Sequence, residues 1–136
     1  MLPPEEARRE LVREWLAKAD EDIHAARILL AGVGASPAII CFHAQQATEK
    51  ALKGLLTWRQ IAFPKTHSIL QLLQSASSVD ESAVLSLQEA ASLTVYAVHA
   101  RYPGTPGPVT IAVARQAFDL ACRVRAEVMS RLEGML

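Results

Sequence analysis

The chain is poor in cysteine and in aromatic residues, and each shortage excludes a class of protein. Its two cysteines, Cys41 and Cys122, are too few for a disulfide framework and too far apart in the sequence for a zinc pattern. Each is flanked by apolar residues, so we expect two reduced core thiols and no metal site. Aromatic residues make up only 5% of the chain, and Ala and Leu dominate the apolar set. This composition favours closely packed helices over a β-sheet.

An excess of positive charge is also missing. Lys and Arg together number 14, and so do Asp and Glu, which gives a formal net charge of zero. This balance argues against a protein that coats DNA non-specifically, because such proteins need a basic surface. It leaves room for a small, local nucleotide or RNA site.

Unbroken apolar runs long enough for a membrane helix are absent as well. The longest apolar stretch, 28–42, is interrupted by two glycines, a serine and a proline. The first residues lack the basic-then-apolar layout of a signal peptide. We therefore expect no membrane contact and a cytoplasmic location.

The periodicity of apolar residues predicts helices and no strands. Apolar positions recur at three- and four-residue steps over about 5–31, 38–59 and 111–132, with a short helix through 69–73. A fourth long helix, capped by Ser78, should begin near residue 81 and turn one side inward: Val84, Leu87, Ala91, Val95 and Val98. The prediction is an all-α fold: an up-and-down bundle of four long helices and one short helix, in a single domain over residues 1–136.

A row of polar residues on the second predicted helix is the main candidate site. His43, Gln46, Lys50 and Lys53 are spaced three, four and three residues apart, which places them along one face. Such a row can bind a phosphate or the polar edge of a base. Two other interpretations stay open. The row could be a solvated face, or His43, Gln46 and Glu49 could be buried groups that bond across a bundle or dimer interface.

Further candidates lie outside this helix. His67, at the start of the short helix, could act as a general acid or base, or simply cap and pack that helix. Arg101 and Tyr102 offer a planar fork for phosphate and a stacking face, although Tyr102 could instead anchor the following proline-rich loop. Asp20 and Asp22 are expected to be solvated or bonded to a neighbour such as Lys18. Neither a glycine-rich phosphate loop nor a nucleophile elbow is present, so we expect no cofactor.

The residues of the second helix resemble those of the HEPN family. The block Phe-His-Ala-Gln-Gln-Ala at 42–47, followed by Glu-Lys-Ala-Leu-Lys at 49–53, is similar to the second helix of HEPN domains. Three further segments, 19–23, 65–69 and 100–103, follow the order and spacing of that family. The resemblance extends from about residue 13 to 130, which is nearly the whole chain.

This resemblance implies a helical bundle that forms a homodimer and associates with nucleotides or RNA. It also implies pairing with a small nucleotidyltransferase in a toxin–antitoxin-like system. Many HEPN proteins are metal-independent ribonucleases that use an arginine followed four to six residues later by a histidine. Here His99 lies where that histidine is expected, but Thr94 and Val95 occupy the places of the arginine.

We therefore expect a protein that binds nucleotide or RNA rather than one that cleaves it. The predicted binding residues are His43, Gln46, Lys50, Lys53, His67, Arg101 and Tyr102. Two alternatives remain. One is a metal-independent ribonuclease with His67 or His99 as the acid–base group and Arg101 as the phosphate ligand, and the other is a purely structural or interaction module.

Overall fold

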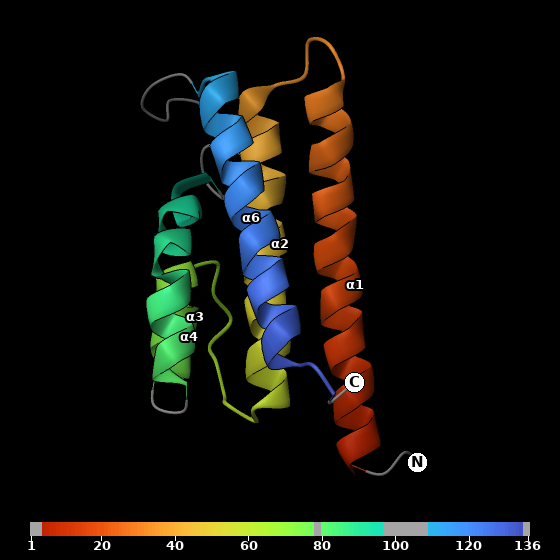
Figure 1. Ribbon diagram of the computed structural model, residues 1–136, viewed down its shortest axis with the longest axis vertical. Helices are drawn as coiled ribbons and strands as arrows, with labels where there is room; N and C mark the ends of the chain where they lie inside the picture. The colour runs from red at the N-terminus through yellow and green to blue at the C-terminus, as the bar shows by residue number, and fades with distance from the viewer. Residues whose placement is uncertain (1–3, 78–79, 97–108, 135–136) are drawn as a thin grey trace.

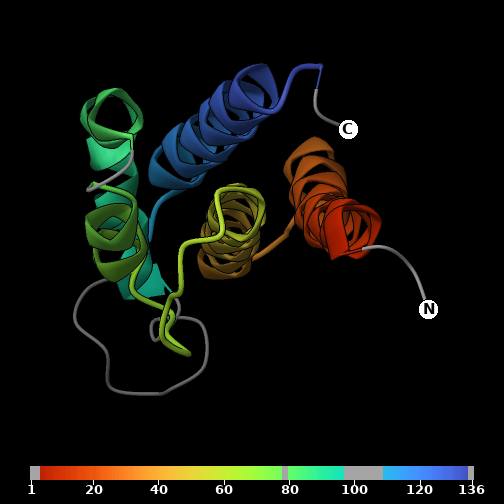
Figure 2. The same cartoon turned by 90° about the horizontal axis from the view of Figure 1, so that it is seen from below.

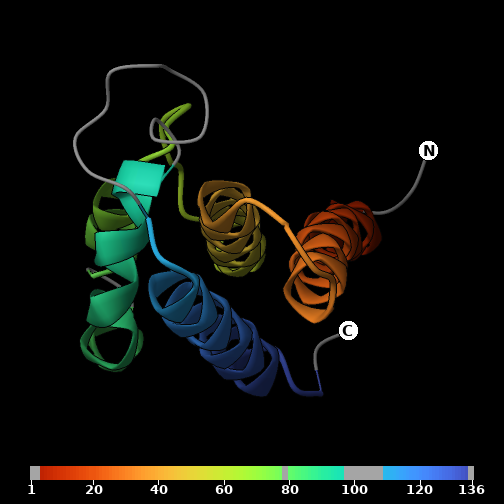
Figure 3. The same cartoon turned by 90° about the horizontal axis from the view of Figure 1, so that it is seen from above.

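Three long helices form the frame of the molecule (Figure 1). The computed structural model describes residues 4–77, 80–96 and 109–134. Helix α1 (Pro4–Ala31), helix α2 (Pro37–Trp58) and helix α6 (Ile111–Arg131) match the predicted long helices to within one or two residues. Seen from below and from above, α2 lies between α1 on one side and α6 on another (Figures 2 and 3).

Local sequence explains where these helices begin and end. Proline stands in the first turn of α2, where its missing N–H group costs no hydrogen bond. Gly34 has a φ of 82°, a conformation that side chains disfavour, so the chain can turn between α1 and α2. At the start of α6 the Thr110 hydroxyl accepts a hydrogen bond from the Val113 N–H group at 3.2 Å, as the sequence predicts.

Small residues on α2 allow α1 to approach closely. Ala44, Ala47, Ala51 and Gly54 are all buried along this helix. A Cβ atom built on Gly54 would lie 3.4 Å from the Trp15 Cβ atom of α1, which shows how near the two backbones are. The core therefore forms around α2, and the residues of α2 that point away from the core are held in fixed positions.

The remaining elements cover a further side of α2. Helix α3 (Ile69–Ala76) is capped by the Ser68 hydroxyl, which accepts from the Gln71 N–H group at 3.2 Å. Helix α4 (Glu81–Leu87) begins at Asp80, whose carboxylate accepts from the Ala83 N–H group at 3.1 Å. The 3₁₀ helix η1 (Gln88–Val95) continues directly from α4. The predicted cap Ser78 lies outside the described residues.

The all-α bundle is confirmed. The predicted fourth helix differs from the structure in its helix type after Leu87 and in which of its residues face the core. The predicted inward residue Leu87, the last of α4, is buried. Beyond it the chain continues as a 3₁₀ helix whose buried residues are Ala90 and Leu93, and their spacing of three matches the three residues per turn of a 3₁₀ helix. The prediction is wrong for Val95, which is 54% exposed. Val98 lies outside the described residues. No strand occurs in 4–77, 80–96 or 109–134.

Helix α6 is also tied to α1 by charge. The Arg125 guanidinium donates to both carboxylate oxygens of Asp20, one of these bonds being 3.0 Å between Nη2 and Oδ2. Both side chains are partly exposed, so the pair contributes orientation more than stability. Within the described part of the chain, no helix is both long and apolar enough to cross a membrane.

Candidate functional site

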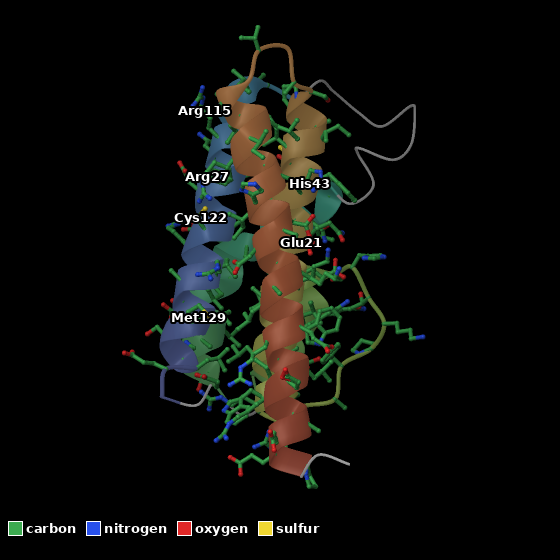
Figure 4. All side chains as sticks on the ribbon, turned by 90° about the vertical axis from the view of Figure 1, so that its right-hand side faces the viewer. Glu21, Arg27, His43, Arg115, Cys122 and Met129 are labelled. Carbon is green, nitrogen blue, oxygen red and sulfur yellow. The ribbon has the colours of Figure 1, made fainter. Side chains whose placement is uncertain are left out.

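One side of α2 faces no described helix and carries the polar residues. In the view from above, α1, α6 and the α3–η1 layer surround α2, and among the described residues the segment 59–68 passes along its remaining side (Figure 3). Figure 4 shows His43 on this side, whereas Arg27 and Cys122 lie on the opposite side of α1. We call this side the polar face of α2. It is defined by His43, Gln45, Gln46, Glu49, Lys50 and Lys53, together with Asp22 of α1 and His67 of the loop.

The first cluster on the polar face joins α1 to α2 through Asp22. The Asp22 Oδ1 atom lies 2.9 Å from His43 Nδ1, and its Oδ2 atom accepts from Lys50 Nζ at 2.6 Å. The Asp22 side chain is 12% exposed, and those of His43 and Lys50 are 27% and 25% exposed. A nearly buried carboxylate therefore holds an imidazole and an ammonium group at the edge of solvent.

The second cluster joins the loop to α2 through Glu49. Lys53 Nζ donates to Glu49 Oε1 at 2.7 Å, and His67 Nδ1 lies 3.2 Å from both carboxylate oxygens. Burial acts to raise the pKa of the Glu49 carboxyl, but hydrogen bonds from Lys53, Gln45 and His67 outweigh it, so the pKa is lowered. Glu49 is therefore an ionised, buried anchor, while the His67 side chain is 59% exposed.

Two buried amides complete the second cluster. Gln45 Nε2 donates to Glu49 Oε2 at 2.9 Å and to the His67 carbonyl oxygen at 3.2 Å. Gln46 Nε2 donates to Gln45 Oε1 at 2.7 Å. These bonds hold the loop carrying His67 against α2, because the amide of Gln45 contacts both the Glu49 side chain and the loop backbone.

The two clusters share one chemical design. Each carboxylate accepts from one lysine and faces the Nδ1 atom of one histidine, so Nδ1 carries the proton in each bond. In both rings Nε2 is then the atom left for a ligand. Each ammonium group has three N–H bonds, of which one goes to its carboxylate. The polar face thus presents two imidazole nitrogens and the ammonium group of Lys50, whereas the side chain of Lys53 is 12% exposed and its ammonium group lies 5.4 Å from the centroid of the Trp15 ring.

The arrangement does not form a metal centre. No group of three or more His, Cys, Asp or Glu side chains stands close enough to hold a metal ion among the residues that the structure describes. The chemistry available on the polar face is hydrogen bonding, charge pairing and proton transfer.

Comparison with known proteins identifies the family of the chain. Residues 12–132 match the HEPN domain. The chain belongs to the HEPN family. The crystal structure of an archaeal HEPN homologue superposes with a TM-score of 0.68 at 26% sequence identity, over 90% of this chain and 98% of that one. A search among curated proteins returned no match.

The structure of this HEPN domain brings five of the predicted site residues onto one face. His43, Gln46, Lys50, Lys53 and His67 all belong to the two clusters of the polar face. Gln46 and Glu49 are 9% and 3% exposed and hydrogen-bonded, whereas the His43 side chain is 27% exposed and the Gln46 bond stays within α2. Bonding of these residues across a dimer interface stays a prediction. The predicted residues His99, Arg101 and Tyr102 lie outside the described residues.

The prediction for Asp22 is wrong. Asp22 is 8% exposed and bonds to His43 and Lys50 of α2 rather than to solvent or to Lys18. Its position could have shown this, because it lies three residues after the buried Ala19 and four before the buried Ala26. A carboxylate at such a position faces the neighbouring helix and needs a partner there.

Thr94, which stands where the ribonuclease arginine of many HEPN domains is expected, has a structural contact. Its hydroxyl accepts from the Ile69 N–H group at 3.1 Å, at the first residue of α3. Val95, the other candidate position for that arginine, carries no polar group. In this HEPN domain Thr94 therefore links η1 to α3 instead of supplying a cation.

Proposed function

We propose that this HEPN domain binds nucleotides or RNA on the polar face of α2. The observation that supports this proposal is the pair of carboxylate-anchored clusters, Asp22 with His43 and Lys50, and Glu49 with Lys53 and His67. The first cluster bridges α1 and α2, and the second joins α2 to the segment between α2 and α3.

Phosphate and base edges fit the donors and acceptors of this face. The lysines and a protonated imidazole can donate to phosphate oxygens, and a neutral imidazole Nε2 can accept from a base amino group. Asp22 and Glu49 fix the geometry in advance, so fewer side chains lose freedom when a ligand binds. The proposal also includes Arg101 and Tyr102, which lie outside the described residues and whose guanidinium fork and aromatic ring suit a phosphate and a stacked base.

The proposal also includes partners, which we infer from membership of the HEPN family and not from the contacts of the polar face. We infer that the domain works in the cytoplasm as a homodimer. We also infer that it acts with a small nucleotidyltransferase in a toxin–antitoxin-like system. A short nucleotidyltransferase reading frame beside the gene would support this pairing, and co-purification of the two products would test it.

Isothermal titration with mononucleotides and with short single-stranded RNA tests the binding proposal. Lys50→Met removes one ammonium group from the polar face, and we expect the RNA affinity to fall by about tenfold, the usual effect of one charged hydrogen bond. Lys18→Met is the matched control, because Lys18 is an exposed lysine of α1 that pairs only with Glu21. An absence of binding heat in the folded wild-type protein contradicts the proposal.

A metal-independent ribonuclease is a second candidate, and the exposure of His67 favours it. Its imidazole is held through Nδ1 by a buried carboxylate, which leaves Nε2 as a possible general base. This function predicts RNA cleavage in EDTA that disappears in the double variant His67→Ala, His99→Ala. Cleavage that persists in that variant excludes this pair as the catalytic groups.

The buried amides favour one further alternative, an interaction module without a ligand. In that case Gln46→Ala, which removes the bond to Gln45, changes the oligomeric state and leaves RNA affinity unchanged. The binding proposal expects the wild-type protein to bind RNA, whereas the interaction module binds none. Titration and size-exclusion chromatography therefore distinguish these two functions.

A further inference from the structure

Two arginines at the lower end of the bundle have unsatisfied donors. The Nε atoms of Arg8 and Arg59 are both buried, and neither has a hydrogen-bond partner within the part of the chain that the structure describes. A buried N–H group without an acceptor is destabilising, and such groups are rare in folded proteins. Figure 2 shows this end of the molecule, where the start of α1 and the ends of α2 and α6 come together.

Arg59 shares its only described carboxylate partner with a stronger competitor. Asp80 accepts from the Ala83 N–H group, the Ser82 hydroxyl and Arg131 Nη1, the last at 2.9 and 3.1 Å. Arg59 Nη2 is 3.4 Å from the same carboxylate. The oxygens of Asp80 are therefore largely occupied, and the Nε side of the Arg59 guanidinium is left with no acceptor.

Arg8 has no carboxylate partner among the described residues. Its guanidinium carbon lies 4.4 Å from the centroid of the Trp58 ring, which is the residue directly before Arg59. Stacking on an aromatic ring holds a guanidinium in place while leaving its edge available for hydrogen bonds. Both arginines therefore lie at the last turn of α2: Arg8 stacks on Trp58, and Arg59 is the next residue in the sequence.

From these contacts we infer a second anion site, formed by Arg8 and Arg59 around Trp58, whose ligand is a phosphate group. Each guanidinium binds an oxyanion best through two parallel N–H bonds, and the Nε edge of both is unfilled. Two such forks need more acceptor oxygens than a single carboxylate has, whereas a terminal phosphate has three. Small shifts of the two side chains bring the Nε atoms to the ligand and relieve their unsatisfied state.

This site is separate from the polar face of α2 and does not depend on the function proposed for it. The hydrogen bonds that form the two clusters of the polar face involve neither Arg8 nor Arg59. The phosphate group can come from a free phosphate compound or from the terminal phosphate of an RNA, so the experiment uses both sources.

Thermal unfolding with added pyrophosphate tests the site, using Arg8→Met and Arg59→Met. Methionine keeps most of the apolar stem and removes the donors. We expect pyrophosphate to stabilise the wild-type protein and each variant to bind it at least about tenfold more weakly. The ligand-free melting temperature of each variant is its own baseline, because Arg8→Met also removes the stacking on Trp58 and Arg59→Met the ion pair with Asp80. The control is Arg115→Met, which removes an exposed arginine at the opposite end of the bundle (Figure 4).

Short single-stranded RNA, followed by fluorescence anisotropy, identifies the source of the phosphate. Weaker binding of both 5′-phosphorylated RNA and pyrophosphate supports a contact with the terminal phosphate of RNA, and weaker binding of pyrophosphate alone supports a free phosphate compound. The inference is overturned if pyrophosphate does not stabilise the wild type, or if both variants bind it as tightly as Arg115→Met does. Substitution of Lys50 tests the polar face independently, so failure of one site is distinguishable from failure of the other.

Discussion

Replacement of Glu49 by glutamine should destabilise the domain more than any other single change on the polar face. The Glu49 side chain is 4% exposed and that of its partner Lys53 is 12% exposed. Removing the negative charge leaves a nearly buried ammonium group without its counter-ion, for which the usual cost is about 3–5 kcal/mol. The glutamine oxygen still accepts from Lys53, so we expect the low end, about 3 kcal/mol. For a chain of this length that lowers the melting temperature by roughly 10 °C.

Urea unfolding followed by circular dichroism measures this change, and a double variant isolates its cause. Glu49→Leu with Lys53→Met removes both charges and should cost less than Glu49→Gln alone, since no uncompensated charge remains. A Glu49→Gln variant within about 0.5 kcal/mol of wild type refutes the argument that Glu49 is an ionised anchor. So does a double variant whose loss equals the sum of the two single losses.

The pH dependence gives an independent check. The pKa of Glu49 is lowered in the folded protein, because the hydrogen bonds from Lys53, Gln45 and His67 outweigh burial. Its contribution to stability is therefore fully present above the unfolded-state pKa of about 4.3 and is lost as the pH falls through the lower folded value. The stability difference between wild type and Glu49→Gln should be largest at neutral pH and shrink in acid. A difference that stays constant from neutral pH to about pH 3 contradicts this sign.

Two further predictions concern the core. Gly54→Ala should change stability by less than about 1 kcal/mol, because the gain in helix propensity is offset by a Cβ contact of 3.4 Å with Trp15. Gly54→Leu should destabilise the protein by several times that amount. Equal melting temperatures for the two variants would show that α1 and α2 are not closely packed at this position. Cys41 is fully buried, and burial raises its pKa to about 11. Alkylation of the native protein at mildly alkaline pH should therefore modify the partly exposed Cys122 first. Mass spectrometry that shows Cys41 modified equally fast would contradict its burial.

The long helices could be predicted from the sequence because their apolar positions repeat with the α-helical period. The bounds of α1, α2 and α6 came within one or two residues for this reason. The segment after Leu87 could not be predicted in the same way. Its apolar residues fit both a three-residue and a 3.6-residue period over so short a length, and only packing against α6 and α3 decides between them.

The polar face shows a similar division. The spacing of His43, Gln46, Lys50 and Lys53 along one helix is a local property, and it placed them correctly on one face. Their partners come from elsewhere in the chain. The Asp22–Lys50 bond spans 28 residues and the His67–Glu49 bond spans 18, so both depend on how the helices and the loop pack. The salt bridge between Asp20 and Arg125 escaped prediction for the same reason.

The two carboxylates divide the polar face into halves that are anchored to different parts of the chain. Asp22 belongs to the long, rigid helix α1, whereas the histidine held by Glu49 belongs to the irregular segment between α2 and α3. A shift of the segment between α2 and α3 would move the His67 imidazole away from Glu49 and leave His43 and Lys50 bonded to Asp22. The affinity for a ligand bound on this face would then fall in two steps, as the contacts of each half are lost, rather than in one.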